Sequence, residues 1–190
     1  MGVMIPYDKL ITTNLLDNSC VTAVIEQLNL LPYKMVKEFY DNDWNIRIIK
    51  DSIEFHLGER IPGPDDGFTG GITFWDVRAI YIPAGSPEGC DIPNWYIKFA
   101  TIHEFGHYLD RSKGYISMSY EFQKIYNAED RIFCENIGRA SNTESCIEYF
   151  AESFACYVND DGKMRELCPL TCAYFDNIFS TTLSIPSLSA

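Results

Sequence analysis

The stretch that decides the fold runs from Thr101 to Asp110 and reads TIHEFGHYLD. Residues four apart on an α-helix lie one turn apart on the same face, so His103 and His107 can direct their imidazoles toward one point. Glu104 lies beside that point. Two imidazoles in this HExxH arrangement bind zinc, and the Glu between them acts as a general base. The spacing therefore predicts a catalytic metal centre on one helix.

The alternative is a helix that carries two histidines by coincidence. The chain has only three histidines, and two of them stand at ligand spacing, which favours the metal. The third, His56, lies far upstream, and we interpret it as an ordinary surface or core residue. Gly106 costs ~1 kcal/mol in a helix interior, so we expect another backbone or a ligand to approach the helix closely there.

A hydrolytic zinc site takes three protein ligands and leaves the fourth position to water. In the metzincin pattern a third His stands six residues after the second, where this chain has Lys113, so that class is excluded. Asp110 shares a face with His107. Because its side chain is short, we favour hydrogen bonding to a ligand histidine, or packing at the helix end, over a ligand role.

The stretch SNTESCIEYFAESFACYV, residues 141–158, supplies carboxylates instead. Its first four residues form a capping box ahead of an apolar helix, which predicts that Ser141 is the cap. Glu144, Glu148 and Glu152 recur every four residues on one face of that helix. Because buried carboxylates need partners, we predict Glu148 as the third ligand and Glu152 as the acceptor for a ligand histidine. The alternative is that Glu144 caps the helix and the other two face solvent.

The rest of the chain predicts an α+β domain. Residues 19–43 read as two short helices broken at Pro32, and residues 44–52 as a strand. After a loop rich in Gly, Pro and Asp, residues 72–82 read as a β-hairpin that turns at 76–78. A helix follows from about residue 95 to about 111, capped by Asn94 or the region of Asp91, and one short helix follows Cys168.

Composition sets the remaining limits. With 190 residues, 46% of them hydrophobic, and no linker, residues 1–190 are expected to form a single domain. The net charge of −12 argues against binding to nucleic acid, whose phosphates attract Lys and Arg. No apolar run approaches the ~20 residues that span a bilayer. No signal peptide is visible, so we expect a protein that works inside a cell or one whose signal has been removed.

The seven cysteines are an odd number, so at least one stays free or pairs outside the chain. We favour reduced thiols. Cys168 and Cys172 have three residues between them, which fits neither a redox motif nor a zinc knuckle, and we interpret the pair as structural.

With HEFGHYLD followed by EYFAESFA, the sequence resembles the lethal-factor-like zinc metalloproteases, a group that includes the catalytic domain of anthrax lethal factor and the Pro-Pro endopeptidases. The resemblance covers roughly residues 70–160. It implies a zincin-like fold, in which a small twisted sheet with an edge hairpin lies beside the active-site helix and the C-terminal part is helical. It also implies one zinc ion per chain, held by His103, His107 and Glu148, with Glu104 as the general base.

The resemblance further implies a zinc endopeptidase of the gluzincin type, defined by HExxH plus a ligand Glu. We expect its peptide or protein substrate to add as an extended strand to the edge of the 72–82 hairpin. Trp75, near the hairpin turn, is either a substrate contact or a packing residue.

One position departs from the family. Its members place an oxyanion-stabilising tyrosine about seven residues before the ligand Glu, where this chain has Ser141, or Ile137 if a small insertion is allowed. Loss of such a donor costs about 10²–10³ in turnover. A zincin-fold module that binds peptides without cleaving them is therefore the second hypothesis. A protease specific for a single regulatory protein is the third.

Overall fold

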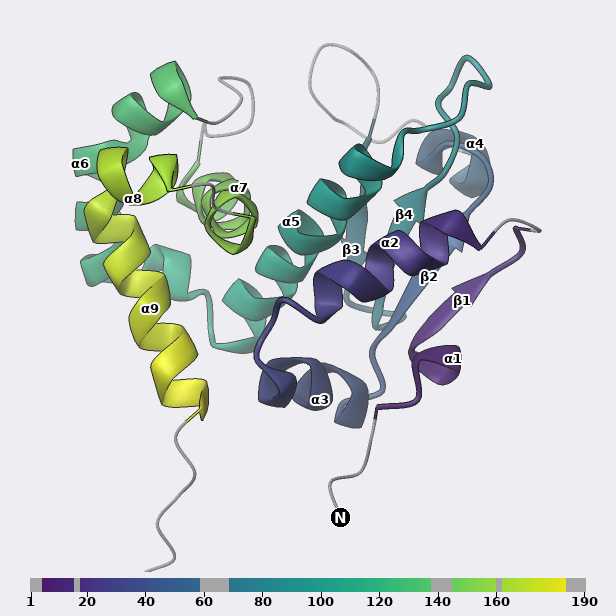
Figure 1. Ribbon diagram of the computed structural model, residues 1–190, viewed down its shortest axis with the longest axis horizontal. Helices are drawn as coiled ribbons and strands as arrows, with labels where there is room; N and C mark the ends of the chain where they lie inside the picture. The colour runs from purple at the N-terminus through teal and green to yellow at the C-terminus, as the bar shows by residue number, and fades with distance from the viewer. Residues whose placement is uncertain (1–4, 16–17, 59–68, 138–144, 160–161, 184–190) are drawn as a thin grey trace, which may run out of the picture.

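The helix that carries the HExxH motif, α5 (Asn94–Ser112), stands between a small sheet and a group of helices (Figure 1). This computed structural model describes residues 5–15, 18–58, 69–137, 145–159 and 162–183. The architecture is the α+β arrangement that the sequence predicts. Helix α5 therefore lies where both the sheet and the group of helices can contribute residues next to its exposed face.

The sheet has four strands in the order β1-β2-β4-β3. Three of them run parallel, namely β1 (Ile11–Thr13), β2 (Asn45–Ile49) and β4 (Ala79–Pro83). The fourth, β3 (Ile72–Phe74), pairs antiparallel with β4 and lies at the edge. This β3–β4 pair is the hairpin expected from residues 72–82, and its edge position is confirmed.

Strand β4 is buried over its whole length because it lies inside the sheet and contacts helices. Helix α5 packs on β3 and β4 and is itself covered by α2 (Ser19–Leu28). The short helix α4 (Ile53–Leu57) also contacts β4. A central strand covered in this way reads as a continuous apolar run, which explains the sequence AIYIP.

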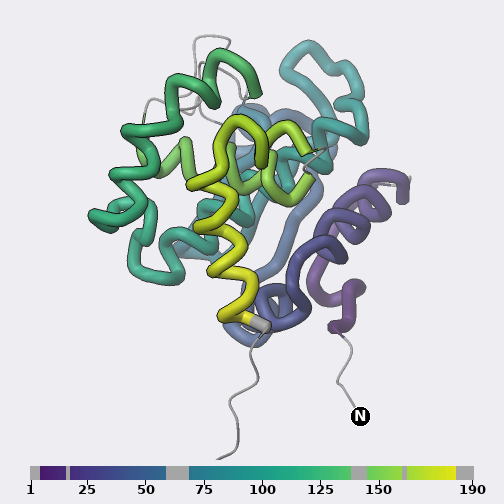
Figure 2. Tube along the Cα trace, turned by 60° about the vertical axis from the view of Figure 1, so that its left-hand side comes forward, coloured from purple at the N-terminus to yellow at the C-terminus, as the bar shows by residue number. Residues whose placement is uncertain are grey.

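The helical part follows α5 in the chain. It consists of a 3₁₀ turn at Ile116–Met118 and the helices α6 (Tyr120–Asn136), α7 (Cys146–Val158), α8 (Lys163–Leu167) and α9 (Pro169–Leu183). Figure 2 shows α9 running past α3 (Tyr33–Asp41), with which it is in contact. The largest cluster of buried hydrophobic residues extends from Leu10 to Phe175 and so includes both halves.

Two predicted helix caps are wrong, although the start of α5 itself lies within one residue of the expected position. Helix α5 begins at Asn94 after Pro93, which makes no side-chain capping bond, so the expected cap at Asn94 or near Asp91 does not form. Proline before a helix has no N–H to satisfy and fixes φ, which is enough to begin it. Helix α7 is capped by Ser145, whose hydroxyl accepts from the Glu148 N–H, whereas the predicted cap lies outside the described residues.

Some elements were not anticipated. Strand β1, the preceding helix α1 (Tyr7–Leu10) and helix α6 were not predicted, and α9 is 15 residues long rather than short. None of the seven cysteines, all of which lie in the described residues, forms a disulfide, and the Cys168 and Cys172 side chains are buried in the main core. Among the described helices, none is both long enough and apolar enough to cross a bilayer.

Candidate metal centre

Helices α5 and α7 cross in close contact, and Gly106 makes this contact possible. A Cβ atom at Gly106 would lie 2.9 Å from the Cα of Ala151 on α7. A backbone atom cannot move aside cheaply, so a larger residue would separate the two helices. The close approach expected at Gly106 is therefore confirmed. It brings the face of α7 that carries Glu148 and Glu152 against the histidine face of α5.

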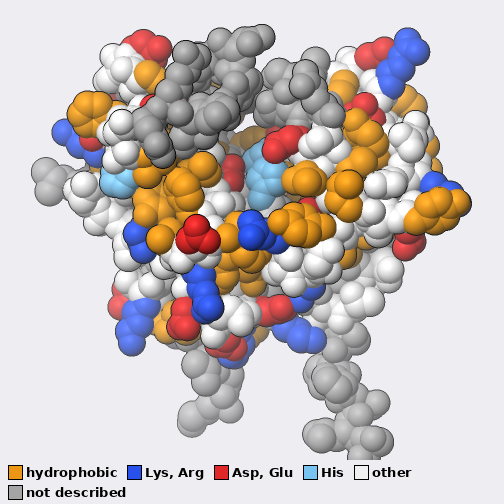
Figure 3. Space-filling model, turned by 180° about the vertical axis from the view of Figure 1, so that it is seen from behind, with side chains coloured by type: hydrophobic (Ala, Val, Ile, Leu, Met, Phe, Trp, Pro, Cys, Tyr) orange, Lys and Arg blue, Asp and Glu red, His pale blue; other side chains and the backbone are white. Residues whose placement is uncertain are grey.

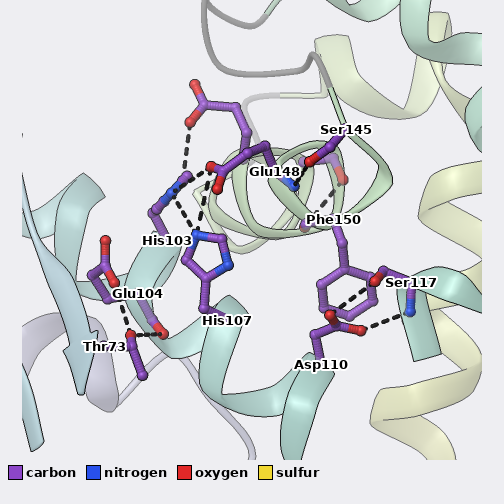
Figure 4. Close-up of polar contacts among 11 residues, drawn as sticks. Thr73, His103, Glu104, His107, Asp110, Ser117, Ser145, Glu148 and Phe150 are labelled. Carbon is purple, nitrogen blue, oxygen red and sulfur yellow. Dashed lines mark hydrogen bonds and ion pairs between the residues drawn. The ribbon is translucent and has the colours of Figure 1, made fainter. Parts of the chain in front are cut away.

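Three side chains from these two helices converge (Figure 4). His103 Nε2 and His107 Nε2 lie 3.1 Å apart. Glu148 Oε2 lies 3.5 Å from each of them. The imidazoles are mostly buried, whereas 43% of the Glu148 side chain is exposed, so the group faces a hollow. Figure 3 shows such a hollow, with histidine and acidic side chains visible among hydrophobic ones.

The dimensions of this triangle fit a metal ion. Ligand atoms about 2.0–2.1 Å from a tetrahedral zinc lie about 3.3 Å from one another. The three observed separations of 3.1, 3.5 and 3.5 Å bracket that value. Two imidazole nitrogens and a carboxylate oxygen are also a donor set that zinc accepts. His103, His107 and Glu148 are therefore suited to hold a metal ion.

Glu152 contacts the ring nitrogen of His103 that is not part of the triangle. Its Oε2 is 3.1 Å from His103 Nδ1, and its side chain is 1% exposed. Because a carboxylate accepts, His103 donates from Nδ1 and its Nε2 is left for the metal. Burial acts to lower the pKa of His103, but hydrogen bonds to Glu148 and Glu152 outweigh it and raise the pKa to about 10. The site thus stabilises positive charge.

Glu148 has the complementary shift. Burial acts to raise its pKa, but hydrogen bonds from His103 and His107 outweigh that effect and hold the pKa well below its usual range. The carboxylate is therefore charged at neutral pH without a metal. A charged oxygen that faces two imidazoles is a ready ligand for a divalent cation.

Glu104 occupies the sheet side of α5, beside the triangle and separate from it (Figure 4). It is 6% exposed, and its Oε2 accepts a hydrogen bond of 2.7 Å from the Thr73 hydroxyl on β3. The same hydroxyl lies 3.0 Å from the main-chain oxygen of Glu104. Our sequence analysis did not single out Thr73. A Thr in a short strand has no motif of its own, and only the alternation of faces in β3 points it toward α5.

Asp110 is 1% exposed and lies one turn beyond His107. One of its oxygens accepts from the Ser117 N–H at 2.6 Å, and the other accepts from the Ser117 hydroxyl at 2.8 Å (Figure 4). These contacts fasten the end of α5 to the following 3₁₀ turn. Packing at the helix end was one of the two roles expected for Asp110. Both of its carboxylate oxygens take part in these contacts with Ser117.

Trp75 packs within an aromatic group at the hairpin turn. Its ring lies 4.6 Å from that of Trp44 and 6.1 Å from that of Tyr108, and the Arg111 guanidinium lies 4.4 Å above it. These contacts give Trp75 a packing role, and its contact with substrate stays a prediction. His56 is exposed on α4, with its ring 5.7 Å from that of Tyr81, as an ordinary surface residue.

Ile137 and Ser141 are the two positions at which the family's oxyanion-stabilising tyrosine was expected, and the structure describes only the first of them. Ile137 ends α6 and packs against the main core, and its hydrocarbon side chain donates no hydrogen bond. Ser141 lies outside the described residues. The oxyanion donor of the family therefore has no counterpart at Ile137.

Comparison with known proteins agrees with this geometry. Residues 95–178 match the family model described as anthrax toxin lethal factor, N- and C-terminal domain, and this range contains α5 and α7. The solved structure of the Pro-Pro endopeptidase PPEP-2 from Paenibacillus alvei superposes with a TM-score of 0.69 at 22% identity. The match covers 91% of this chain and 99% of that one.

No curated protein matches this chain in sequence. The residues that match the family model contain both motifs, HEFGHYLD and EYFAESFA. The resemblance to the lethal-factor-like zinc metalloproteases, and the zincin-like fold that it implied, are therefore confirmed.

Proposed function

We propose that this chain is a zinc-dependent endopeptidase that binds one zinc ion through His103, His107 and Glu148. The observation that carries the proposal is the triangle of two imidazole nitrogens and one carboxylate oxygen at zinc-ligand spacing. Its likeness in fold to a Pro-Pro endopeptidase supports a peptide as substrate. HExxH with a Glu ligand from a second helix corresponds to the gluzincin type.

In the proposed reaction, Glu104, Glu152 and Asp110 have separate roles beside the metal ligands. Zinc in such a site lowers the pKa of water and polarises a peptide carbonyl. Glu104, on the sheet side of the same helix, accepts the proton of the attacking water and later gives it to the leaving amine. Glu152 holds His103 in the tautomer that leaves Nε2 for the metal. Asp110 fixes the end of the helix that presents both histidines.

The substrate peptide is proposed to bind along β3. This strand pairs with β4 on one side and ends the sheet on the other, and it contacts α5 near Glu104. An extended peptide added to this edge forms main-chain hydrogen bonds and lies across the metal centre. Exposed Trp95 at the start of α5 and half-buried Phe99 beside His103 offer apolar contacts on the same helix.

The alternative is a zincin-fold module that binds peptides without turnover. It is motivated by Ile137, which gives no oxyanion donor. A protease dedicated to one regulatory protein is a further candidate, for which generic peptides are not substrates.

The test is zinc content and cleavage of a randomised peptide library by wild type, Glu148→Ala and Glu104→Ala. The proposal predicts one zinc per chain, lost in Glu148→Ala, and cleavage that Glu104→Ala abolishes while retaining zinc. Zinc without cleavage of the library or of native protein extracts would favour the binding module. Cleavage of a single protein in an extract would favour the dedicated protease, and equal cleavage by wild type and Glu104→Ala would refute Glu104 as the base.

A further inference from the structure

Strand β3 presents two different faces. Side chains alternate along a strand, so Ile72 and Phe74 share one face, while Thr73 and the preceding Gly71 share the other. Ile72 and Phe74 pack against the smaller core cluster, whose buried members are Ile49, Ile53, Ala79 and Tyr81. Gly71 and Thr73 instead face α5, and both of them meet the same side chain, that of Glu104.

The Thr73 hydroxyl lies between two oxygens of Glu104. It is 2.7 Å from Oε2 of the carboxylate and 3.0 Å from the main-chain oxygen. A hydroxyl has one proton to donate and two lone pairs with which to accept. Thr73 therefore donates to Oε2 of the carboxylate, which is the nearer of the two oxygens.

Gly71 limits the position of Glu104 from the same side. A Cβ atom at Gly71 would lie 2.7 Å from Glu104 Cγ and 3.0 Å from Oε1. The space that any other residue would fill at position 71 is thus occupied by the Glu104 side chain. With Oε2 bonded to Thr73, Oε1 is the oxygen left for proton transfer.

We propose that β3 positions the general base, with the Thr73 hydroxyl fixing Oε2 of Glu104 and Gly71 leaving room for its side chain. This inference rests on the proposed function, in which Glu104 is the base. The attacking water loses a proton to Oε1 as its oxygen bonds to the peptide carbonyl carbon. That proton then passes to the leaving nitrogen as the carbon–nitrogen bond breaks. Thr73 is a positioning residue, because it acts through Glu104.

This arrangement links substrate binding to the base. The edge of β3 is the strand edge on which the peptide is proposed to bind, and its side chain at position 73 holds the carboxylate. The scissile bond and the base are thereby placed by the same three-residue strand. Catalytic groups placed to within a fraction of an ångström gain rate from such a common frame.

The test compares Thr73→Val, which keeps the shape and loses the hydroxyl, with Thr73→Ser, which keeps the hydroxyl. Thr12→Val is the matched control, since Thr12 is an exposed residue of the opposite edge strand β1. Each variant is assayed for zinc content and for kcat and KM on a peptide that the wild type cleaves. Crystal structures of wild type and Thr73→Val record the position of the Glu104 carboxylate.

We expect Thr73→Val to lower kcat by about 10- to 100-fold, with KM and zinc content unchanged and the carboxylate displaced. Thr73→Ser is expected to recover most of kcat, and Thr12→Val to match wild type. Gly71→Ala is expected to fold, because the flexible Glu104 side chain can move, and to lower kcat in the same way.

Wild-type kcat in Thr73→Val, or equal losses in Thr73→Val and Thr73→Ser, would overturn the inference while leaving the proposed function intact. Absence of cleavage by wild type would instead contradict the proposed function. The crystal structures decide the positioning role in that case too, since an unmoved carboxylate in Thr73→Val would overturn it.

Discussion

Two glutamates of the C-terminal helices, Glu152 on α7 and Glu129 on α6, are both buried but have different partners. Their side chains are 1% and 4% exposed. Glu152 accepts from His103 Nδ1 at 3.1 Å. Glu129 accepts from the N–H groups of Leu170 and Thr171 at 2.8 and 2.9 Å, and from the Thr171 hydroxyl at 2.7 Å.

The different partners indicate different roles: Glu129 stabilises the fold, whereas Glu152 supports the metal site. Glu129 satisfies the free N–H groups in the first turn of α9, where a negative charge is also favoured by the helix dipole. Glu152 satisfies an imidazole that belongs to the metal triangle. A buried carboxylate alone therefore does not indicate a site. Its partner does, and substitutions at Glu129, at Glu152, at the two helix caps and at Asp110 test that distinction.

The largest effect is expected at Glu129. Glu129→Ala leaves the N–H groups of Leu170 and Thr171 without their acceptor and removes one partner of the Thr171 hydroxyl, so the free energy of unfolding should fall by roughly 3 kcal/mol. Urea unfolding of the metal-free protein measures it. The exposed Glu135→Ala, also on α6, is the control and should remain near wild type. Reduced zinc content in folded Glu129→Ala would show that Glu129 also supports the metal site, which would contradict the distinction between the two glutamates.

Glu152→Gln should act on the metal instead. The amide oxygen still accepts from His103 but without charge, so zinc affinity should fall about 10-fold, and at most 100-fold, while stability changes little. Competition with a chromophoric chelator measures the affinity. An affinity equal to that of the wild type would show that Glu152 is as structural as Glu129.

Helix caps sharpen the comparison further. Ser145 caps α7, which carries the ligand Glu148, and Ser119 caps α6, which carries Glu129. Substitution of either Ser by Ala should cost about 1 kcal/mol in unfolding free energy. Only Ser145→Ala should also weaken zinc binding, because it loosens the first turn of the helix that holds a ligand. Equal zinc affinities in the two variants would contradict this.

Asp110→Asn should have the smallest effect. Burial raises the pKa of Asp110, and the hydrogen bonds from Ser117 only partly oppose it. A folded-state pKa above the unfolded value means that the folded protein binds the proton more tightly, so wild-type stability falls as pH rises between the two pKa values. Asn cannot lose a proton and can still bond to Ser117.

The variant should therefore change stability by less than about 1 kcal/mol at low pH and should gain relative to wild type toward neutral pH. Urea unfolding at pH values from 3 to 7 measures the difference. A relative loss by Asp110→Asn as pH rises would show that the charged form of Asp110 is the stabilising one.

The sequence predicted most where a spacing has one geometric meaning. HExxH fixes two histidines on one face of a helix, and Gly106 correctly indicated a close neighbour, which proved to be Ala151 on α7. The β3–β4 hairpin followed from two apolar runs around a turn. These signals are local, because all the residues involved are close together in the chain.

Other features depend on contacts between distant segments, which local patterns do not reveal. Thr73 and Glu104 are 31 residues apart, and Glu129 and Thr171 are 42 apart. Strand β1 is three residues long with two of them exposed, so it has no apolar alternation to detect. The cap of α7 was misassigned because Ser141 and Ser145 both precede the apolar run, and only the helix start distinguishes them.

The central claim is that His103, His107 and Glu148 form a zinc site. X-ray absorption at the zinc edge tests it most directly, because it distinguishes imidazole, oxygen and sulfur ligands. The account predicts two imidazoles with all ligands at about 2.0–2.1 Å, and one imidazole fewer in His107→Ala. Sulfur at about 2.3 Å would instead place the metal on some of the seven cysteines and would contradict the account.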